Sequence, residues 1–162
     1  MTIHDWSEFF VAAAGAAAAL AGLIIVAMTV GVDQMIKIPG MVSRGATAIA
    51  LLIAATIVGL AGLIPGQTAT AMGIEVLVIG ACALAFAVDS AVRVIHGRQG
   101  TSLFDAAVKS LIAVLPGVAY VVGAGILIAG SVTGLYAVAL GIALSVVVAV
   151  INAWVMLVEI RR

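Results

Sequence analysis

Residues 73–94 read GIEVLVIGACALAFAVDSAVRV, and this stretch decides how often the chain can cross a membrane. Its uncharged centre, residues 76–88, is only 13 residues long, whereas a helical crossing needs about 20 apolar residues. Taken alone, the stretch leaves two alternatives open: a full crossing, or a short buried or re-entrant segment. The choice depends on the rest of the chain.

The composition is that of an integral membrane protein. Apolar residues make up 65% of the 162 residues and charged residues 9%, whereas a soluble domain has roughly 45–50% and about 25%. This length predicts a single transmembrane domain, 1–162. The single cysteine, Cys82, excludes an internal disulfide. A net charge of zero without a basic run argues against nucleic acid as a partner.

Three other uncharged runs supply further crossings, at residues 9–32, 45–74 and 110–158. The second run would be about 45 Å long as one helix, which is too long for one crossing, so Pro65 and Gly66 should end a helix there. The third run fits two crossings with a break at residues 130–134, GSVTG. The predicted helices are about 9–31, 45–64, 73–94, 104–129 and 134–158.

The basic residues decide between four and five crossings. They are Lys37, Arg44, Arg93, Arg98, Lys109, Arg161 and Arg162. With five crossings all of them fall on one side of the membrane, whereas four crossings would separate the last two from the first two. Because basic residues accumulate on the cytoplasmic side, we predict an all-α bundle of five transmembrane helices. Its N-terminus lies outside and its C-terminus lies in the cytoplasm.

The fifth predicted helix carries small residues at every fourth position, a spacing that lets helices approach closely in lipid. This ladder consists of Ala137, Gly141, Ser145, Ala149 and Ala153. It can pack against the chain's own helices or, alternatively, form a subunit interface. Because five short-looped helices leave little room for a solvated cavity, we expect a homo-oligomer or association with partner membrane helices.

Asp89 is the first polar candidate inside a crossing, where an ionisable group costs roughly 2.5–3.5 kcal/mol on insertion scales. Arg93 follows at i+4 on the same helix face. The pair can let the helix end reach the interface, with the arginine extending to water. Alternatively, Asp89 is a buried acid that faces a polar path or a subunit contact, where Asn152 lies at a similar depth and could hydrogen-bond to it.

Glu75 is the second candidate, placed by the predicted boundaries in the first turn of the third helix. An acid there complements the positive end of the helix dipole, and Gln67 and Thr70 could form a polar cap with it. The alternatives are a site where a cation or proton enters and a contact with an outside partner.

The connection after the third helix and the helix that follows it carry two further predictions. Arg93, Arg98 and Lys109 can attract anionic lipid headgroups. The Ser102 and Asp105 spacing resembles a capping box, so a helix should begin near Leu103. Pro116 should kink this helix, because proline lacks the N–H of a regular helical bond.

The sequence contains no phosphate-binding glycine loop, no nucleophile elbow and no paired histidine–glutamate helix motif. We therefore expect a non-enzymatic protein without cofactor or metal. The leading hypothesis is an oligomeric scaffold or accessory subunit that packs through small-residue helix faces. The alternative is a small channel or transporter with a polar path near Asp89 and Asn152, between protomers.

Three markers lie within residues 9–78: an alanine-rich opening helix, the connection IPG…SRGA and the turn LIPGQ…GIEVL. In these markers the first half resembles a family of small polytopic bacterial membrane proteins of unknown function, common among actinobacteria. The resemblance implies a multi-pass topology in a bacterial plasma (inner) membrane, and it implies no activity.

The predicted orientation can be tested by cysteine labelling in a chain whose Cys82 is replaced by alanine. A cysteine in place of Gln67 should react with an impermeant maleimide on intact cells. A cysteine in place of Gln99 should react only after permeabilisation. The reverse pattern would contradict the orientation with the N-terminus outside.

Overall fold

A computed structural model describes residues 2–36, 41–96 and 103–160, and within these ranges every regular element is helical. The elements are η1 (Ile3–Trp6), α1 (Ser7–Met35), α2 (Met41–Ala61), α3 (Ala69–His96), α4 (Leu103–Ile128) and α5 (Gly134–Ile160). Five helices are long and apolar enough to cross a membrane, which indicates a multi-pass membrane protein. The prediction of five helices long enough to cross is confirmed, and residues 73–94 lie within one continuous helix, α3.

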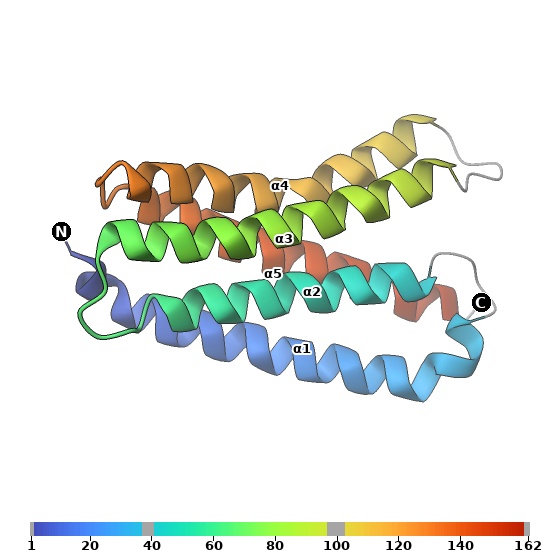
Figure 1. The fold of residues 1–162 in the computed structure, drawn as a ribbon. Helices are drawn as coiled ribbons and strands as arrows, with labels where there is room; N and C mark the ends of the chain where they lie inside the picture. The colour runs from blue at the N-terminus through green and yellow to red at the C-terminus, as the bar shows by residue number, and fades with distance from the viewer. Residues whose placement is uncertain (1, 37–40, 97–102, 161–162) are drawn as a thin grey trace.

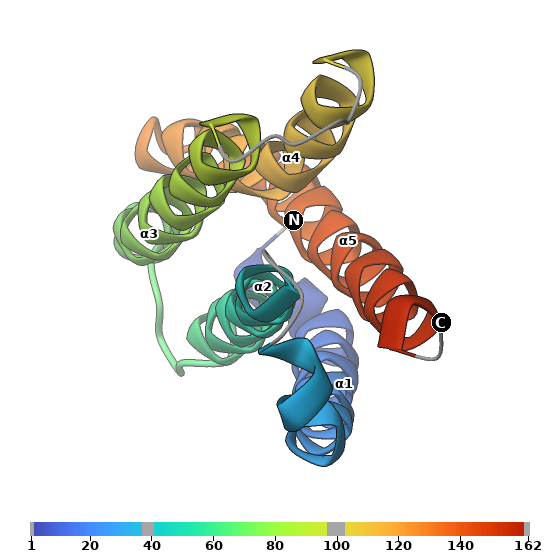
Figure 2. The same cartoon turned by 90° about the vertical axis from the view of Figure 1, so that its right-hand side faces the viewer.

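The helices run alternately along the long axis of the bundle, and the two chain ends lie at opposite ends of it (Figure 1). We call these the N-terminal end and the C-terminal end of the bundle. α2 packs against α1, α3 and α5, whereas α4 packs against α3 and α5. Figure 2 shows the C-terminal end, where α2 lies between the α3–α4 pair and α1. α2 therefore joins α1 to the rest of the bundle.

The basic residues that lie in described helices share one end of the bundle. Arg44 lies in the first turn of α2, Arg93 in the last turn of α3 and Lys109 in the second turn of α4. These helix ends all belong to the C-terminal end (Figure 1). The other basic residues, Lys37, Arg98, Arg161 and Arg162, lie outside the described residues.

The turn after α2 occurs where the proline–glycine pair predicts it, but α2 ends earlier, at Ala61. The Ile64 N–H donates to the Ala61 carbonyl at 3.2 Å, so a tighter i to i−3 turn replaces the last part of the predicted helix. Pro65 then offers no N–H, and Gly66 adopts a φ of +72° that favours glycine.

The start of α3 corrects one prediction. Thr68 caps the helix, because its Oγ1 accepts a hydrogen bond from the Ala71 N–H at 3.2 Å, and α3 begins at Ala69. The first turn of α3 therefore contains no acid, and Glu75 lies further along the helix. The predicted role of Glu75 as a partner of the helix dipole is wrong.

α4 begins at Leu103, as predicted, and contains Pro116 in its interior. Figure 1 shows that α4 changes direction near its middle, so that its yellow half diverges from α5. The turn to α5 falls at residues 129–133, close to the predicted break. Gly130 adopts a φ of +85° in this turn, which again favours glycine.

Tyr120 of α4 occupies the contact between three helices and is fully buried. A Cβ added at Gly80 of α3 would lie 2.7 Å from the Tyr120 Cβ. A Cβ added at Gly141 of α5 would lie 2.8 Å from the Tyr120 Cδ1. One large aromatic side chain therefore packs against two helices at positions where neither has a side chain.

Aromatic residues close the N-terminal end. The Trp6 ring meets the Tyr136 ring edge to face with centroids 4.9 Å apart, which holds η1 against the start of α5. Phe10 is fully buried, and a Cβ at Gly62, the residue after the end of α2, would collide with its ring. These contacts fasten α1 to α2 and α5 at this end.

The contact between Gly80 and Tyr120 predicts different effects for two glycine-to-alanine changes. Gly80→Ala should lower stability by about 1–2 kcal/mol, because overpacking costs about 1–3 kcal/mol and exceeds the gain in helix propensity of up to about 1 kcal/mol. Gly125→Ala in α4 is the matched control, because no atom lies within 4 Å of its added Cβ. The control should be neutral or slightly stabilising in a thermal melt in mild detergent. Equal effects of the two changes would contradict the packing.

Candidate functional site

The polar centre of the bundle is the pair of Tyr120 and Ser145. The two hydroxyl oxygens lie 3.1 Å apart, and the Ser145 hydroxyl also donates to the Gly141 carbonyl at 2.8 Å. Both side chains are fully buried. Without water, each buried hydroxyl needs a protein partner, so this pair links α4 to α5 and keeps the phenol satisfied.

The small-residue ladder of α5 faces the chain's own helices over most of its length. Gly141, Ser145 and Ala149 are buried within the chain, while Ala137 and Ala153 are half-buried. Tyr120 covers Gly141, and Ala149 belongs to the main hydrophobic core. The middle of the ladder is therefore occupied by intrachain contacts, and only its ends remain partly open.

Asp89 and Asn152 are not brought together within one chain. Asp89 is exposed on α3, whereas Asn152 is half-buried on α5. α3 packs against α4 and α2, and Figure 2 shows the C-terminal end of α5 on the far side of α2 from α3. No hydrogen bond joins the two described side chains. The side chain of Arg93 lies outside the described part of the structure.

A hydroxyl cluster that the sequence did not reveal lies beside Asp89. Ser90 of α3 places its Oγ 3.3 Å from the Ser43 Oγ and accepts a hydrogen bond from the Thr47 Oγ1, also at 3.3 Å. Thr47 donates to the Ser43 carbonyl as well, at 2.9 Å. These contacts fasten α2 to α3 near the C-terminal end. A possible signal was the Ser43 and Thr47 spacing of one helical turn.

Gln67 and Glu75 form the polar contact of the N-terminal end. The Gln67 Nε2 donates to a carboxylate oxygen of Glu75 at 2.6 Å, in line with the polar cap considered from the sequence. The Gln67 Oε1 is buried and has no hydrogen-bond partner among the described residues. Both side chains are half-buried, so the carboxylate is oriented by a neutral partner.

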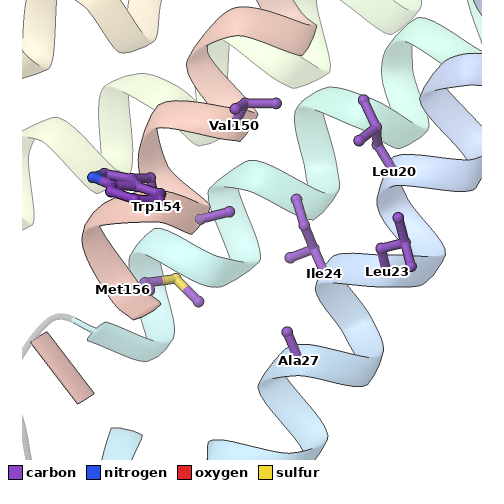
Figure 3. Close-up of a pocket in the computed structure, with 8 residues that line it drawn as sticks. Leu20, Leu23, Ile24, Ala27, Val150, Trp154 and Met156 are labelled. Atoms are coloured by element: carbon purple, nitrogen blue, oxygen red, sulfur yellow. The ribbon is translucent and has the colours of Figure 1, made fainter. Parts of the chain in front are cut away.

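An apolar groove opens between α1 and α5 towards the C-terminal end, with a volume of about 240 Å³. Figure 3 shows its lining, which comes from α1 on one side and α5 on the other. The lining residues are Leu20, Leu23, Ile24, Ala27, Val150, Ala153, Trp154 and Met156. The groove exists because α1 is held mainly by α2 and makes few contacts with α5.

Methionines pack the bundle next to this groove. Met35, Met41 and Met156 form a small buried cluster with Met28 at its edge. A Cβ at Gly45 would collide with the end of the Met28 side chain. Methionine is flexible and adapts to irregular gaps, so the core at this end can adjust more easily than the region around Tyr120.

Three further predictions concern the connection before α4 and possible metal binding. Arg98 and Ser102 lie outside the described residues, as do the side chains of Arg93 and Lys109. The predicted attraction of anionic lipid therefore stays a prediction. Within the described ranges, no group of three or more His, Cys, Asp or Glu side chains could hold a metal ion.

Comparisons of the chain with known protein families, with curated proteins and with solved structures find no match. The resemblance to the actinobacterial family therefore stays a prediction based on the quoted markers.

The strength of the Tyr120–Ser145 contact can be measured in a double-mutant cycle. Tyr120→Phe and Ser145→Ala each remove one hydroxyl without adding bulk. We expect a coupling free energy of about 0.5–1.5 kcal/mol, in the range measured for hydrogen bonds between membrane helices. Additive effects in reversible unfolding would contradict a direct hydrogen bond.

Proposed function

We propose that the protein is a non-enzymatic scaffold or accessory subunit of a bacterial plasma membrane. It would bind a transmembrane helix in the groove between α1 and α5, either from a second copy of the chain or from a partner protein. The single observation that carries this proposal is the groove itself, an apolar concavity along two helices that touch each other little.

The lining of the groove suits a helix. Ala27 and Ala153 are small, and small residues let a helix backbone come close, which drives helix association in lipid. Trp154 lines the groove and is 68% exposed, so a large anchor residue is free to bury against an incoming helix. Ala153 also belongs to the predicted ladder, so one end of the ladder contributes to the proposed contact.

The uncharged, well-packed interior of the bundle favours a scaffold over a channel or transporter. Residues 9–32, 45–74 and 110–158 carry no charge, and Tyr120 fills the contact of α3 with α4 and α5. A water-filled path through one copy would have to displace this side chain.

The membrane and the orientation are part of the same proposal. We propose that the C-terminal end of the bundle lies in the cytoplasm, because basic residues accumulate on the cytoplasmic side, and the family resemblance suggests a bacterial plasma membrane. The homo-oligomer is the form of assembly that we propose, because the groove of each copy can accept a helix of its neighbour.

A larger side chain in the groove between α1 and α5 should weaken self-association without preventing the chain from folding. Ala153→Leu places a larger side chain in the groove, and we expect about a tenfold weaker self-association, equal to about 1.4 kcal/mol. Ala143→Leu is the matched control, because Ala143 lies on the same helix and is exposed. Oligomeric mass in mild detergent is the readout, and thermal melting checks that both variants fold.

A monomeric wild type that also captures no partner helix by crosslinking in membranes would contradict this proposal. The sequence-based alternative predicts ion or proton flux in liposomes that Asp89→Asn changes while assembly survives. A scaffold predicts no flux from the wild type, so measured flux of that kind would favour the alternative.

A further inference from the structure

A second groove lies at the N-terminal end, between α2 and α3, with a volume of about 340 Å³. Its apolar walls are Ile57, Leu60, Ala61 and Ile64 of the α2 side and Ile79 of α3. Glu75 is the one acidic residue that lines it. The groove therefore joins a hydrocarbon surface to a single carboxylate.

The contact that orients the Glu75 carboxylate leaves one polar atom of its partner without a hydrogen bond. Gln67 donates its Nε2 to Glu75 at 2.6 Å, and its own Oε1 stays buried without a partner in the described part of the chain. Such an unmade hydrogen bond is unfavourable for a buried acceptor. Of the two side chains only Glu75 lines the groove, so its second carboxylate oxygen is the acceptor that a donor-bearing ligand there can satisfy.

The charge around this site is negative. Residues 45–92 contain no Lys or Arg, and neither do residues 1–36 or 110–160. Asp5 and Glu8 add two more acids at the same end of the bundle. The only histidine here, His4, lines a separate cavity with Gln67. Among the described residues, no lysine or arginine lies at this end of the bundle to pair with Glu75.

Glu75 lies near the N-terminal end of the apolar span Ala69–Ser90. Glu75 lies six positions after Ala69, which is about 9 Å along the helix at 1.5 Å per residue. The headgroup region on each side of the hydrocarbon core is about 5–7 Å thick. A lipid headgroup can therefore reach the carboxylate while its chain stays in the groove.

We propose that the α2–α3 groove binds a lipid with a primary amine in its headgroup. The ammonium group donates a hydrogen bond to the Glu75 carboxylate, and an acyl chain lies along Ile57, Leu60 and Ile79. A carboxylate favours an ammonium donor by charge as well as by hydrogen bonding. A phosphate alone would meet the acids of this end without a basic residue to receive it.

Three lipids with identical acyl chains test the chemistry on the wild-type protein. Phosphatidylethanolamine carries an ammonium with N–H donors, and phosphatidylcholine carries a positive charge without donors. Phosphatidylglycerol carries no positive charge, and its donors are neutral hydroxyl groups. Native mass spectrometry of the purified full chain would count bound lipids. We expect phosphatidylethanolamine to bind about tenfold more tightly than the other two, the gain of one charge-assisted hydrogen bond at a half-exposed site.

Two variants test whether Glu75 is responsible for the preference for phosphatidylethanolamine. Glu75→Gln keeps the shape of the side chain and should reduce phosphatidylethanolamine binding to the level of phosphatidylglycerol. Glu8→Gln is the matched control, because it removes one negative charge from the same end of the bundle at an exposed position outside the groove. It should leave the preference unchanged.

Three outcomes would overturn the proposal. Equal binding of all three lipids would show that the groove takes any acyl chain. Equal binding of phosphatidylethanolamine and phosphatidylcholine would show recognition of charge without hydrogen bonding. A loss of oligomer mass in Glu75→Gln, with lipid preference retained, would assign the site to a cationic group of a second copy. None of these results depends on the groove between α1 and α5, so this proposal can fail while the proposed function stands.

Discussion

The bundle depends on the fit of the Tyr120 side chain between two glycines. In lipid, helices gain little from hydrophobicity when they meet, so close packing and hydrogen bonds must hold them together. Tyr120 supplies both, because its ring fills the space left by Gly80 and Gly141 and its hydroxyl reaches Ser145. α3, α4 and α5 are thereby fixed to one another at a single level of the bundle.

Packing becomes less regular from this level towards the C-terminal end. α4 changes direction near its middle and diverges from α5 (Figure 1), and Pro116 lies in its interior. α1 stays with α2, so the groove of Figure 3 opens between α1 and α5. The flexible cluster of Met35, Met41 and Met156 fills part of the remaining space. The proposed helix-binding groove between α1 and α5 therefore lies where the tight core does not reach.

The crossings were predictable from the sequence because charge and hydropathy act on whole helices. The short uncharged centre of residues 73–94 did not by itself predict a full crossing. The positions of the basic residues, considered together, favoured a fifth membrane-spanning helix there. Boundaries were less predictable, because they depend on local hydrogen bonds. Thr68 caps α3, so the helix begins at Ala69, earlier than predicted. Glu75 therefore lies beyond the first turn of α3, the turn in which the sequence had placed it.

The polar contacts were predictable only where both partners lie close in the sequence. Gln67 and Glu75 are eight residues apart, and their contact was considered in advance. Tyr120 and Ser145, 25 residues apart, were not paired from the sequence, because nothing local shows which helix faces meet. The proposed partnership of Asp89 with Asn152 failed within one chain for the same reason, since similar depth does not make two helices neighbours.

The fit of Tyr120 is tested most directly by measuring the thermal stability of Gly141→Ala in two backgrounds. A Cβ at this position would lie 2.8 Å from the Tyr120 Cδ1 and 2.9 Å from its Cε1, so the collision is with the ring. Gly141→Ala should be clearly destabilising in the wild type. In a Tyr120→Leu background it should be neutral or stabilising, because the smaller side chain can move aside and alanine favours the helix. An equal loss of stability in both backgrounds would contradict the account.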